Sequence, residues 1–250
     1  MKALLAIIPL LTSTATAAFP PAFILAGDST TAVQAENGGG WGNGFLSFLE
    51  SPATGVNKGH NGATTKSFVD GGDWDAVKDL VIPYQQGNEE EGGRDVYVTI
   101  QFGHNDQKET SGVSLEQFEA NLVALAEDIW QLGATPILLT PLTRRQFTST
   151  HSADDSLHNE RLATISAAET SNTTYLDLNA ASLAYVNAIG ETAAHAYNLK
   201  EGDNTHLNAW GSVVFGRLVA DLLLEKKPEL ASWIRPNETM SALIQDGLPA

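Results

Sequence analysis

Five short runs of apolar and β-branched residues constrain the fold of this chain more than any other feature of its sequence. They are Ala22–Ala26, Thr54–Asn57, Val96–Phe102, Pro136–Thr140 and Thr174–Leu178. Most of them are continuous rather than alternating, which is typical of strands that are buried on both faces. Segments with helical periodicity lie between the runs. A strand followed by a helix, repeated along the chain, predicts an α/β fold with a parallel sheet and helices on both of its faces.

The clearest helical pattern covers residues 114–133. Its apolar residues fall on one face: Phe118, Leu122, Leu125, Ile129 and Leu132. Ser114 and Gln117 form a capping-box pattern at its start, and a glycine follows its end. Residues 155–170 and 208–227 show similar patterns. We therefore expect amphipathic helices that pack against the predicted sheet.

The N-terminus has the features of a signal peptide. Lys2 precedes an apolar run over residues 3–11, and small residues continue to Ala18, near which we expect cleavage. The apolar run is too short to span a bilayer, and an uncleaved N-terminal anchor is the alternative. We expect a secreted, extracellular protein. The expected organisation is a signal peptide over residues 1–18, one domain over residues 19–236 and a loosely packed C-terminal tail over residues 237–250.

Composition narrows the range of partners. The chain has 250 residues, 42% of them hydrophobic, which suits one domain with a sizeable core. A formal net charge of −16 at pH 7 makes nucleic acid and anionic membranes poor partners. The sequence has no cysteine and therefore no disulfide. Asn172 and Asn237 lie in glycosylation sequons, which suits secretion. We expect a monomer.

Polar segments follow four of the predicted strands. Ser29 comes just after the first strand, Gly62 after the second and Asn105 after the third. Asp203 and His206 come after the fifth strand, in "GDNTHLN". Ligands of an open parallel sheet bind outside the carboxyl ends of the strands, near the point where the strand order reverses. We therefore expect these five residues to converge at one edge of the sheet.

The chemistry of these residues is complementary. A serine hydroxyl is a weak nucleophile until a neighbouring base removes its proton, and His206 is the candidate base for Ser29. Asp203, three residues earlier, is placed to orient the imidazole. The backbone N–H groups of Ser29 and Gly62 and the side-chain amide of Asn105 are candidate donors to an oxyanion. The pattern predicts acyl transfer through a covalent serine intermediate.

Two other interpretations fit parts of the pattern. His104, Asp106, Asp203 and His206 are plausible metal ligands, but no His-x-x-x-His spacing supports a zinc centre and Asn105 would then have no role. The same cleft would also suit a secreted carbohydrate-binding protein without activity. Because the serine, histidine and aspartate are all present, we favour an enzyme that needs no metal or organic cofactor.

Taken in order, these segments resemble the sequence blocks of SGNH (GDSL-type) serine hydrolases, and most of all those of secreted rhamnogalacturonan acetylesterases. The matching stretches are "ILAGDSTTA", "VNKGHNGATTKSF", "FGHND", "TPLTRR" and "DNTHLNAWG". The resemblance covers Phe19 to about Lys227. It implies a catalytic triad of Ser29, Asp203 and His206, and an oxyanion hole formed by Ser29, Gly62 and Asn105.

The resemblance also implies a fold. Members of this family have a flavodoxin-like three-layer α/β/α sandwich with a five-stranded parallel sheet in the order 2-1-3-4-5. In that order the first and third strands are neighbours, so Ser29 and Asn105 flank the switch point. One departure is that Ala63 follows Gly62, where the family often has Gly-Arg-Ser.

The expected substrate is an acetylated polysaccharide of the plant cell wall, most of all the acetylated rhamnogalacturonan of pectin. Acetylated xylan and a broad range of small esters are the alternatives. Arg144 and Arg145 are candidates to hold uronate carboxylates, or else to pair with Asp154 or Asp155. Trp41 is a candidate to stack on a sugar ring, or else to pack within its own glycine-rich loop.

Overall fold

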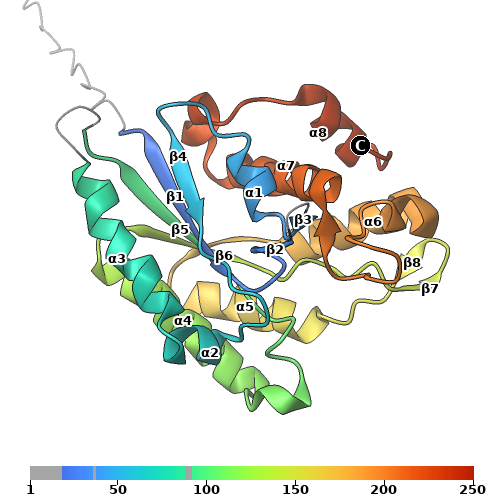
Figure 1. Ribbon diagram of the computed structural model, residues 1–250, viewed down its shortest axis with the longest axis horizontal. Coiled ribbons are helices and arrows are strands. Elements are labelled where there is room, and N and C mark those ends of the chain that lie inside the picture. Colours follow the sequence, from blue (N-terminus) through green and yellow to red (C-terminus); the bar gives the residue numbers. More distant parts are fainter. Residues whose placement is uncertain (1–18, 36–37, 88–91) are drawn as a thin grey trace, which may run out of the picture.

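A computed structural model describes residues 19–35, 38–87 and 92–250, so the expected signal peptide lies outside the described residues. Five parallel strands form its main sheet: β1 (Pro21–Gly27), β4 (Thr54–Asn57), β5 (Asp95–Gln101), β6 (Thr135–Leu139) and β9 (Thr174–Leu176). Their spatial order is β4-β1-β5-β6-β9, which is the expected order 2-1-3-4-5 (Figure 1). The predicted fold is confirmed. The switch point lies between β1 and β5.

Helices cover both faces of the sheet and complete three layers (Figure 1). One layer contains α2 (Thr65–Asp70), α3 (Asp73–Gln86), α4 (Leu115–Gln131) and α5 (His158–Thr170). The other contains α1 (Gly42–Leu46), α6 (Leu178–His195), α7 (Ala209–Lys226) and α8 (Glu238–Gln245). Helices α4, α5 and α7 correspond to the three segments that the sequence pattern singled out.

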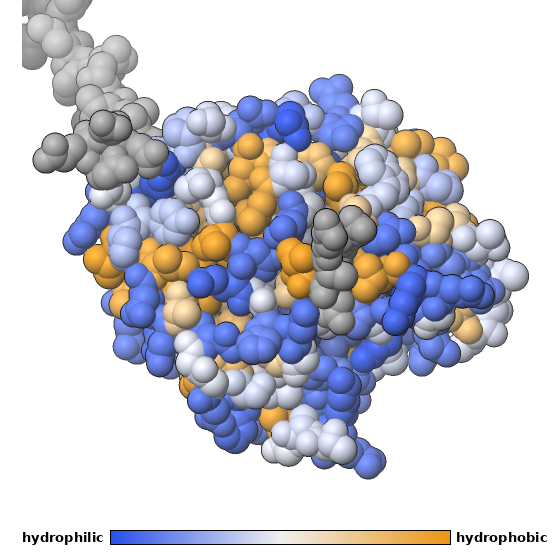
Figure 2. All heavy atoms as spheres, viewed as in Figure 1, coloured by the Kyte–Doolittle hydropathy of each residue, from blue (hydrophilic) through white to orange (hydrophobic). Residues whose placement is uncertain are grey.

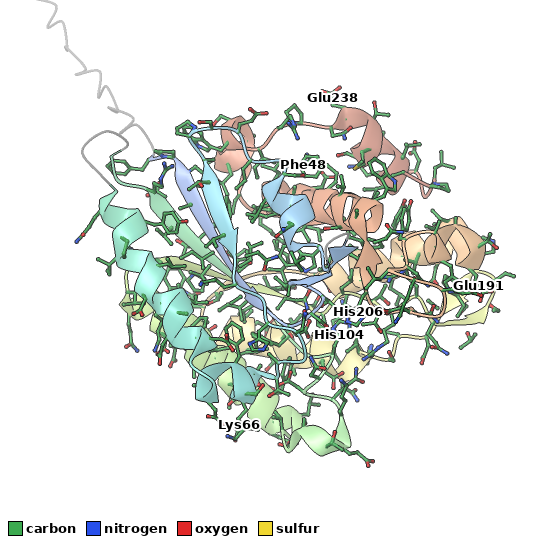
Figure 3. The ribbon with its side chains drawn as sticks, viewed as in Figure 1. Phe48, Lys66, His104, Glu191, His206 and Glu238 are labelled. Carbon is green, nitrogen blue, oxygen red and sulfur yellow. The ribbon has the colours of Figure 1, made fainter. Side chains whose placement is uncertain are left out.

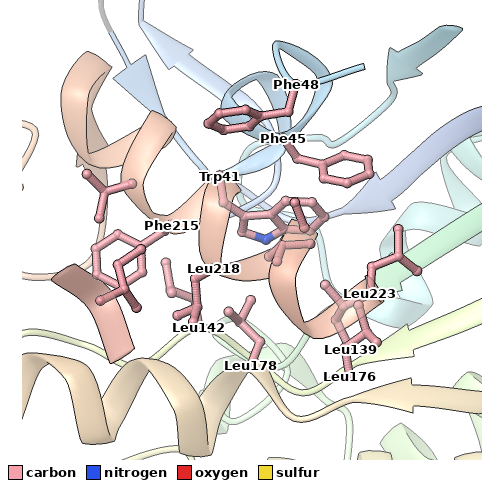
Figure 4. Packing of buried hydrophobic residues seen from close by; sticks show 14 of the residues in the cluster. Trp41, Phe45, Phe48, Leu139, Leu142, Leu176, Leu178, Phe215, Leu218 and Leu223 are labelled. Atoms are coloured by element: carbon pink, nitrogen blue, oxygen red, sulfur yellow. The ribbon is translucent and has the colours of Figure 1, made fainter. Parts of the chain in front are cut away.

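Alternate residues of each central strand enter two separate cores. Phe23 and Leu25 of β1 pack with α1, α6 and α7, whereas Ile24 packs with α3 and α4. All three side chains are fully buried, which explains why this strand is a continuous apolar run. Figure 4 shows the first core, in which Trp41 and Phe45 lie close to leucines of α7 and of the strands.

Helices α1 and α7 cross closely because glycine lies at their contact. A Cβ atom on Gly44 would lie 1.8 Å from the carbonyl oxygen of Ser212, and one on Gly216 would lie 2.3 Å from the backbone nitrogen of Phe45. Neither position has room for a side chain. This contact holds α1, which follows the nucleophile segment, against α7, which follows the histidine segment.

The C-terminal segment packs against the domain, so the expectation of a loose tail over residues 237–250 is wrong. The side chain of Asn237 accepts a hydrogen bond from the backbone N–H of Met240 at 3.1 Å and thereby caps α8. Met240 and Ile244 are buried in the core that also contains α7. Four-residue spacing brings these two apolar side chains to one face of a short helix.

The remaining strands and helices are short. A three-stranded antiparallel sheet consists of β2 (Val33–Ala35), β3 (Gly38–Gly39) and β10 (Leu207–Asn208), in the order β10-β3-β2. A hairpin contains β7 (Phe147–Ser149) and β8 (Ser152–Ala153), and two 3₁₀ helices cover Glu109–Ser111 and Pro228–Trp233. Within the three-stranded sheet Gly39 pairs with both Val33 and Leu207, so the segments after Ser29 and His206 are joined by backbone hydrogen bonds.

The face of the molecule drawn in Figure 2 is mostly polar. Figure 2 shows hydrophilic residues over much of one face, with apolar residues in scattered patches between them. No helix in the described part of the chain combines the length and the apolar character needed to cross a bilayer.

Candidate active site

The nucleophile and base proposed from the sequence meet at the carboxyl end of the sheet. Ser29 lies in the turn that directly follows β1, and its Oγ is 2.8 Å from Nε2 of His206. The two residues are 177 positions apart in the chain. His206 comes from the loop that precedes α7, near the centre of the view in Figure 3. The distance is that of a hydrogen bond, so the imidazole is placed to take the hydroxyl proton.

Asp203 holds the other side of this imidazole. One carboxylate oxygen of Asp203 accepts a hydrogen bond from the backbone N–H of His206 at 2.9 Å, and its two oxygens lie 3.1 and 3.0 Å from Nδ1. Partial burial by itself raises the pKa of Asp203, but the hydrogen bonds from the backbone and ring of His206 bring this pKa below its ordinary value. An ionised Asp203 favours the tautomer with the proton on Nδ1, which leaves Nε2 free to act as a base.

Two of the three candidate oxyanion donors, Gly62 and Asn105, lie on neighbouring loops. Nδ2 of Asn105 donates to the carbonyl oxygen of Ala63 at 2.9 Å, which ties the loop after β5 to the loop after β4. An amide nitrogen carries two hydrogens, so one remains to donate to an oxyanion. Gly62 is exposed with φ +80°, a left-handed conformation that favours glycine. Its backbone conformation, rather than a lack of space, therefore accounts for the glycine.

Buried polar side chains fix the turn that carries Ser29, and Asp28, Thr30 and Gln101 were not among the predicted site residues. Oδ1 of Asp28 accepts hydrogen bonds from the N–H and the hydroxyl of Thr30, both at 2.8 Å. The amide of Gln101 donates to Oγ1 of Thr30 at 2.6 Å and accepts from Nε1 of Trp41 at 2.7 Å. This connected network holds the residues on either side of Ser29 and joins them to β5 through Gln101. The sequence pattern that indicates this network is Asp-x-Thr over residues 28–30, which is typical of a turn.

Trp41 is fully buried and has no exposed ring face for a sugar, so its assignment as a sugar-stacking residue is wrong and the alternative of packing inside the protein holds. Its side chain is fully buried, and its ring lies 6.2 Å from that of Phe45 in an edge-to-face arrangement. The indole packs within the core and anchors the polar network through Gln101.

Arg145 is likewise buried, and the assignment of substrate contact to this residue is also wrong. Its guanidinium donates to Oδ1 of Asn198 at 2.6 Å and to the carbonyl oxygen of His206 at 2.7 Å. Burial lowers the pKa of Arg145 to about 10, although the charge of Asp203 opposes this effect. Arg145 therefore holds the backbone of the loop that carries His206 from inside the protein.

Arg144 is half-buried at the active edge. Its guanidinium donates to Oγ of Ser156 at 3.0 Å and to the carbonyl oxygen of His104 at 3.4 Å. Arg144 is thus hydrogen-bonded to Ser156 and His104, while burial lowers the pKa of its guanidinium and the charge of Asp154 acts against this lowering. Arg144, which lies in the segment after β6, thus contacts the loop that follows β5.

The four side chains considered as metal ligands do not form one group. The ring of His104 lies 3.6 Å from the carboxylate of Asp28, and Asp203 pairs with His206. Across residues 19–35, 38–87 and 92–250, no group of three or more His, Cys, Asp or Glu side chains is arranged to hold a metal ion.

Comparison with known proteins identifies the family. The model of the GDSL-like lipase/acylhydrolase family matches residues 25–213, a stretch that contains all five residues assigned to the triad and oxyanion hole. The chain belongs to this family. It is therefore a carboxylic ester hydrolase, and the resemblance seen in the sequence blocks is confirmed.

Two similar proteins come from Bacillus subtilis (strain 168). Rhamnogalacturonan acetylesterase RhgT is 28% identical over 217 residues, which cover 81% of this chain and 89% of that protein. Probable rhamnogalacturonan acetylesterase YesY is 28% identical over 208 residues, which cover 78% of this chain and 89% of that protein.

Solved structures share the fold. Protein YXIM from Bacillus subtilis matches with a TM-score of 0.72 at 24% identity, over 84% of this chain. The chain spans only 57% of the length of that structure. The acetylxylan esterase Axe2 from Geobacillus stearothermophilus matches with a TM-score of 0.56 at 20% identity, over 82% of this chain and 92% of Axe2.

Proposed function

We propose that this protein is a serine acetylesterase that removes acetyl groups from acetylated rhamnogalacturonan. The observation that carries the proposal is the hydrogen-bonded series from Oγ of Ser29, through the imidazole of His206, to the carboxylate of Asp203. The names of RhgT and YesY support the substrate class.

The first chemical step forms an acetyl-enzyme. Nε2 of His206 takes the proton of Ser29 as Oγ attacks the carbonyl carbon of the acetyl group. The carbonyl oxygen becomes an oxyanion, which accepts hydrogen bonds from the N–H groups of Ser29 and Gly62 and from Nδ2 of Asn105. Each such donor contributes about 3–4 kcal/mol of transition-state stabilisation. His206 then protonates the oxygen of the departing sugar hydroxyl, and the C–O bond to the sugar breaks.

The second step releases acetate. A water molecule gives a proton to Nε2 of His206 as its oxygen attacks the acetyl carbon on Ser29. The same donors hold the second oxyanion. The bond to Oγ then breaks, Oγ recovers the proton from His206, and acetate leaves. Asp203 stabilises the imidazolium in both steps.

We also propose that the protein is secreted and acts as a monomer on polysaccharide outside the cell. The signal-peptide pattern of the sequence supports secretion. Asn172 is exposed and available for glycosylation, whereas Asn237 is half-buried and its side chain caps α8. Arg144 is the residue we propose for contact with uronate carboxylates, since Arg145 is buried.

Acetate release from acetylated rhamnogalacturonan, homogalacturonan and xylan, measured side by side, tests the substrate. We expect the highest kcat/KM on rhamnogalacturonan, and a strong preference for xylan would overturn the substrate but not the mechanism. A serine-reactive phosphonate tests the mechanism. Stoichiometric labelling that is lost in Ser29→Ala supports the enzyme, whereas no labelling of the wild type favours a carbohydrate-binding protein.

A further inference from the structure

Lys108 contacts the side-chain donor of the oxyanion hole. Its Nζ donates a hydrogen bond to Oδ1 of Asn105 at 2.6 Å. The opposite end of the same amide, Nδ2, is the group that the proposed reaction uses. An ammonium group therefore lies on the far side of the amide from the developing negative charge.

Two partners fix the orientation of this amide. An ammonium group only donates hydrogen bonds and a carbonyl oxygen only accepts them. Lys108 therefore requires Oδ1 of Asn105 on its side, and the carbonyl oxygen of Ala63 requires Nδ2 on the other side. A rotation of the amide by 180° would place its NH₂ group against the ammonium and its oxygen against the carbonyl. Among the described residues, the contact with Ala63 is the one hydrogen bond of this amide that would still oppose the rotation without Lys108.

The backbone of Lys108 is itself held in place. Its N–H donates to the carbonyl oxygen of Asn105 at 3.2 Å, and its carbonyl oxygen accepts from the N–H of Ser111 at 2.8 Å. The hydroxyl of Ser111 donates to the carbonyl oxygen of Asp106 at 2.7 Å. These bonds close a turn after β5, so the lysine side chain starts from a fixed position although it is exposed.

We propose that Lys108 is a positioning residue that acts through Asn105. It holds Nδ2 toward the oxyanion, and its charge strengthens this amide as a donor. An oxyanion carries more negative charge than the ground-state carbonyl oxygen, so the contribution is larger in the transition state than in the bound substrate. Loss of Lys108 should therefore lower kcat and leave KM nearly unchanged. The inference rests on the proposed function of Asn105 as an oxyanion donor.

Steady-state kinetics with a chromogenic acetate ester and with acetylated rhamnogalacturonan oligosaccharides test this role. We expect Lys108→Met to lower kcat about 10-fold on both substrates, less than the roughly 10²–10³-fold cost of losing a donor outright. Lys108→Arg keeps a charged donor and should restore kcat close to the wild-type value. Lys66→Met is the matched control. Lys66 is an exposed lysine on α2 that pairs with Asp70 and lies well away from His206 in Figure 3, so its loss should change neither constant.

A double-mutant cycle separates positioning from a direct effect on substrate. In the Asn105→Ala background Lys108→Met should cause no further loss, because the lysine acts through the missing amide. An equal loss in both backgrounds would overturn the inference. A rise in KM at unchanged kcat would also overturn it, since this result indicates that Lys108 binds substrate.

Ser29→Ala separates the failure of this inference from that of the proposed function. If Ser29→Ala keeps the wild-type rate of acetate release, the serine mechanism fails and the role of Lys108 fails with it. If Ser29→Ala is inactive and Lys108→Met retains full kcat, only the positioning role is overturned. Thermal melting of each variant shows whether it is folded.

Discussion

Asp106 accepts two hydrogen bonds from Thr65, one from its backbone N–H at 2.8 Å and one from its hydroxyl at 2.6 Å. Asp106 directly follows Asn105, and Thr65 lies three residues after Gly62. The pair therefore joins the two segments that carry Gly62 and Asn105, the outer donors of the proposed oxyanion hole. Burial raises the pKa of Asp106, and the hydrogen bonds from Thr65 oppose this effect.

We predict that Asp106→Ala lowers kcat by about 100-fold, because a displacement of about 1 Å in a donor has an effect of this size. Asp106→Asn is the matched control, since its amide oxygen still accepts both bonds from Thr65 and should preserve most of the activity. Steady-state kinetics of both variants, with thermal melting to show that they fold, provide the measurement. Wild-type kcat in folded Asp106→Ala would contradict the role of this pair.

Asp203→Asn should lower kcat by about 10³–10⁴-fold without a large change in melting temperature. The carboxylate of Asp203 only accepts hydrogen bonds, whereas an asparagine amide is able to donate to Nδ1 of His206 and thereby select the wrong tautomer. Pre-steady-state measurement of acetyl-enzyme formation is the direct test. If formation of the acetyl-enzyme stays fast in this variant, another group orients the imidazole.

Trp41→Phe should change stability rather than substrate affinity. The substitution removes the indole donor and leaves the buried amide oxygen of Gln101 without its partner, which costs about 1–3 kcal/mol. Chemical denaturation should show this loss, and KM for acetylated oligosaccharides should stay at the wild-type value. A several-fold rise in KM at unchanged stability would instead indicate that the tryptophan contacts substrate.

Gly44→Ala should destabilise the protein by about 1–3 kcal/mol or more, because the added Cβ would overlap the backbone of α7 at Ser212. The same substitution moves α1 away from α7, so partial loss of activity at temperatures well below unfolding is also expected. The free energy of unfolding from urea titration gives the first effect. A variant with wild-type stability would show that the helix pair adjusts at no cost.

The pairing of Asp177 with Arg161 should make stability depend on pH in the acid range. Partial burial by itself raises the pKa of Asp177, but the hydrogen bonds and charge of Arg161 bring this pKa below its ordinary value of 3.8. A lowered folded pKa means that the contribution is fully present above the ordinary value and is lost as pH falls through the folded pKa. Asp177→Asn should therefore cost about 1.5–3 kcal/mol at neutral pH and much less in strong acid. Equal destabilisation at both pH values would contradict this account.

Local patterns in the sequence were sufficient to predict the strands and to single out the residues of the candidate site. A strand buried on both faces is mostly apolar or β-branched, so Ala22–Ala26 and Val96–Phe102 were visible as nearly continuous runs, although the second contains the buried polar residues Thr99 and Gln101. The residues of the proposed triad were visible because Ser29 follows a strand and Asp203 and His206 lie in the polar segment before the last long helix, with the chemistry that acyl transfer needs. Helix α6 was harder to predict, since its apolar residues are not confined to one face and Gly190 interrupts its helical backbone.

Burial of single side chains could not be predicted from local patterns. Trp41 lies in a glycine-rich loop, and nothing near it in sequence identifies Gln101, which is 60 residues away, as its partner. Arg144 and Arg145 are adjacent and chemically identical, so only the direction of the chain after β6 decides which one is buried. The contact between Lys108 and Asn105 could have been predicted from the sequence, since a lysine three residues after Asn105 in a tight turn is able to contact its side chain.

The small sheet of β2, β3 and β10 has a consequence for how enzymes with this architecture diversify. Val33 and Leu207, each only a few positions downstream of Ser29 and His206, share Gly39 as a pairing partner, so main-chain bonds set the spacing of nucleophile and base. The loops after β5 and β6 are not part of this tether. Substrate preference is therefore expected to diverge at other positions of these loops, while Asn105, Asp106 and Arg145 keep their contacts and the proposed nucleophile and base keep their alignment.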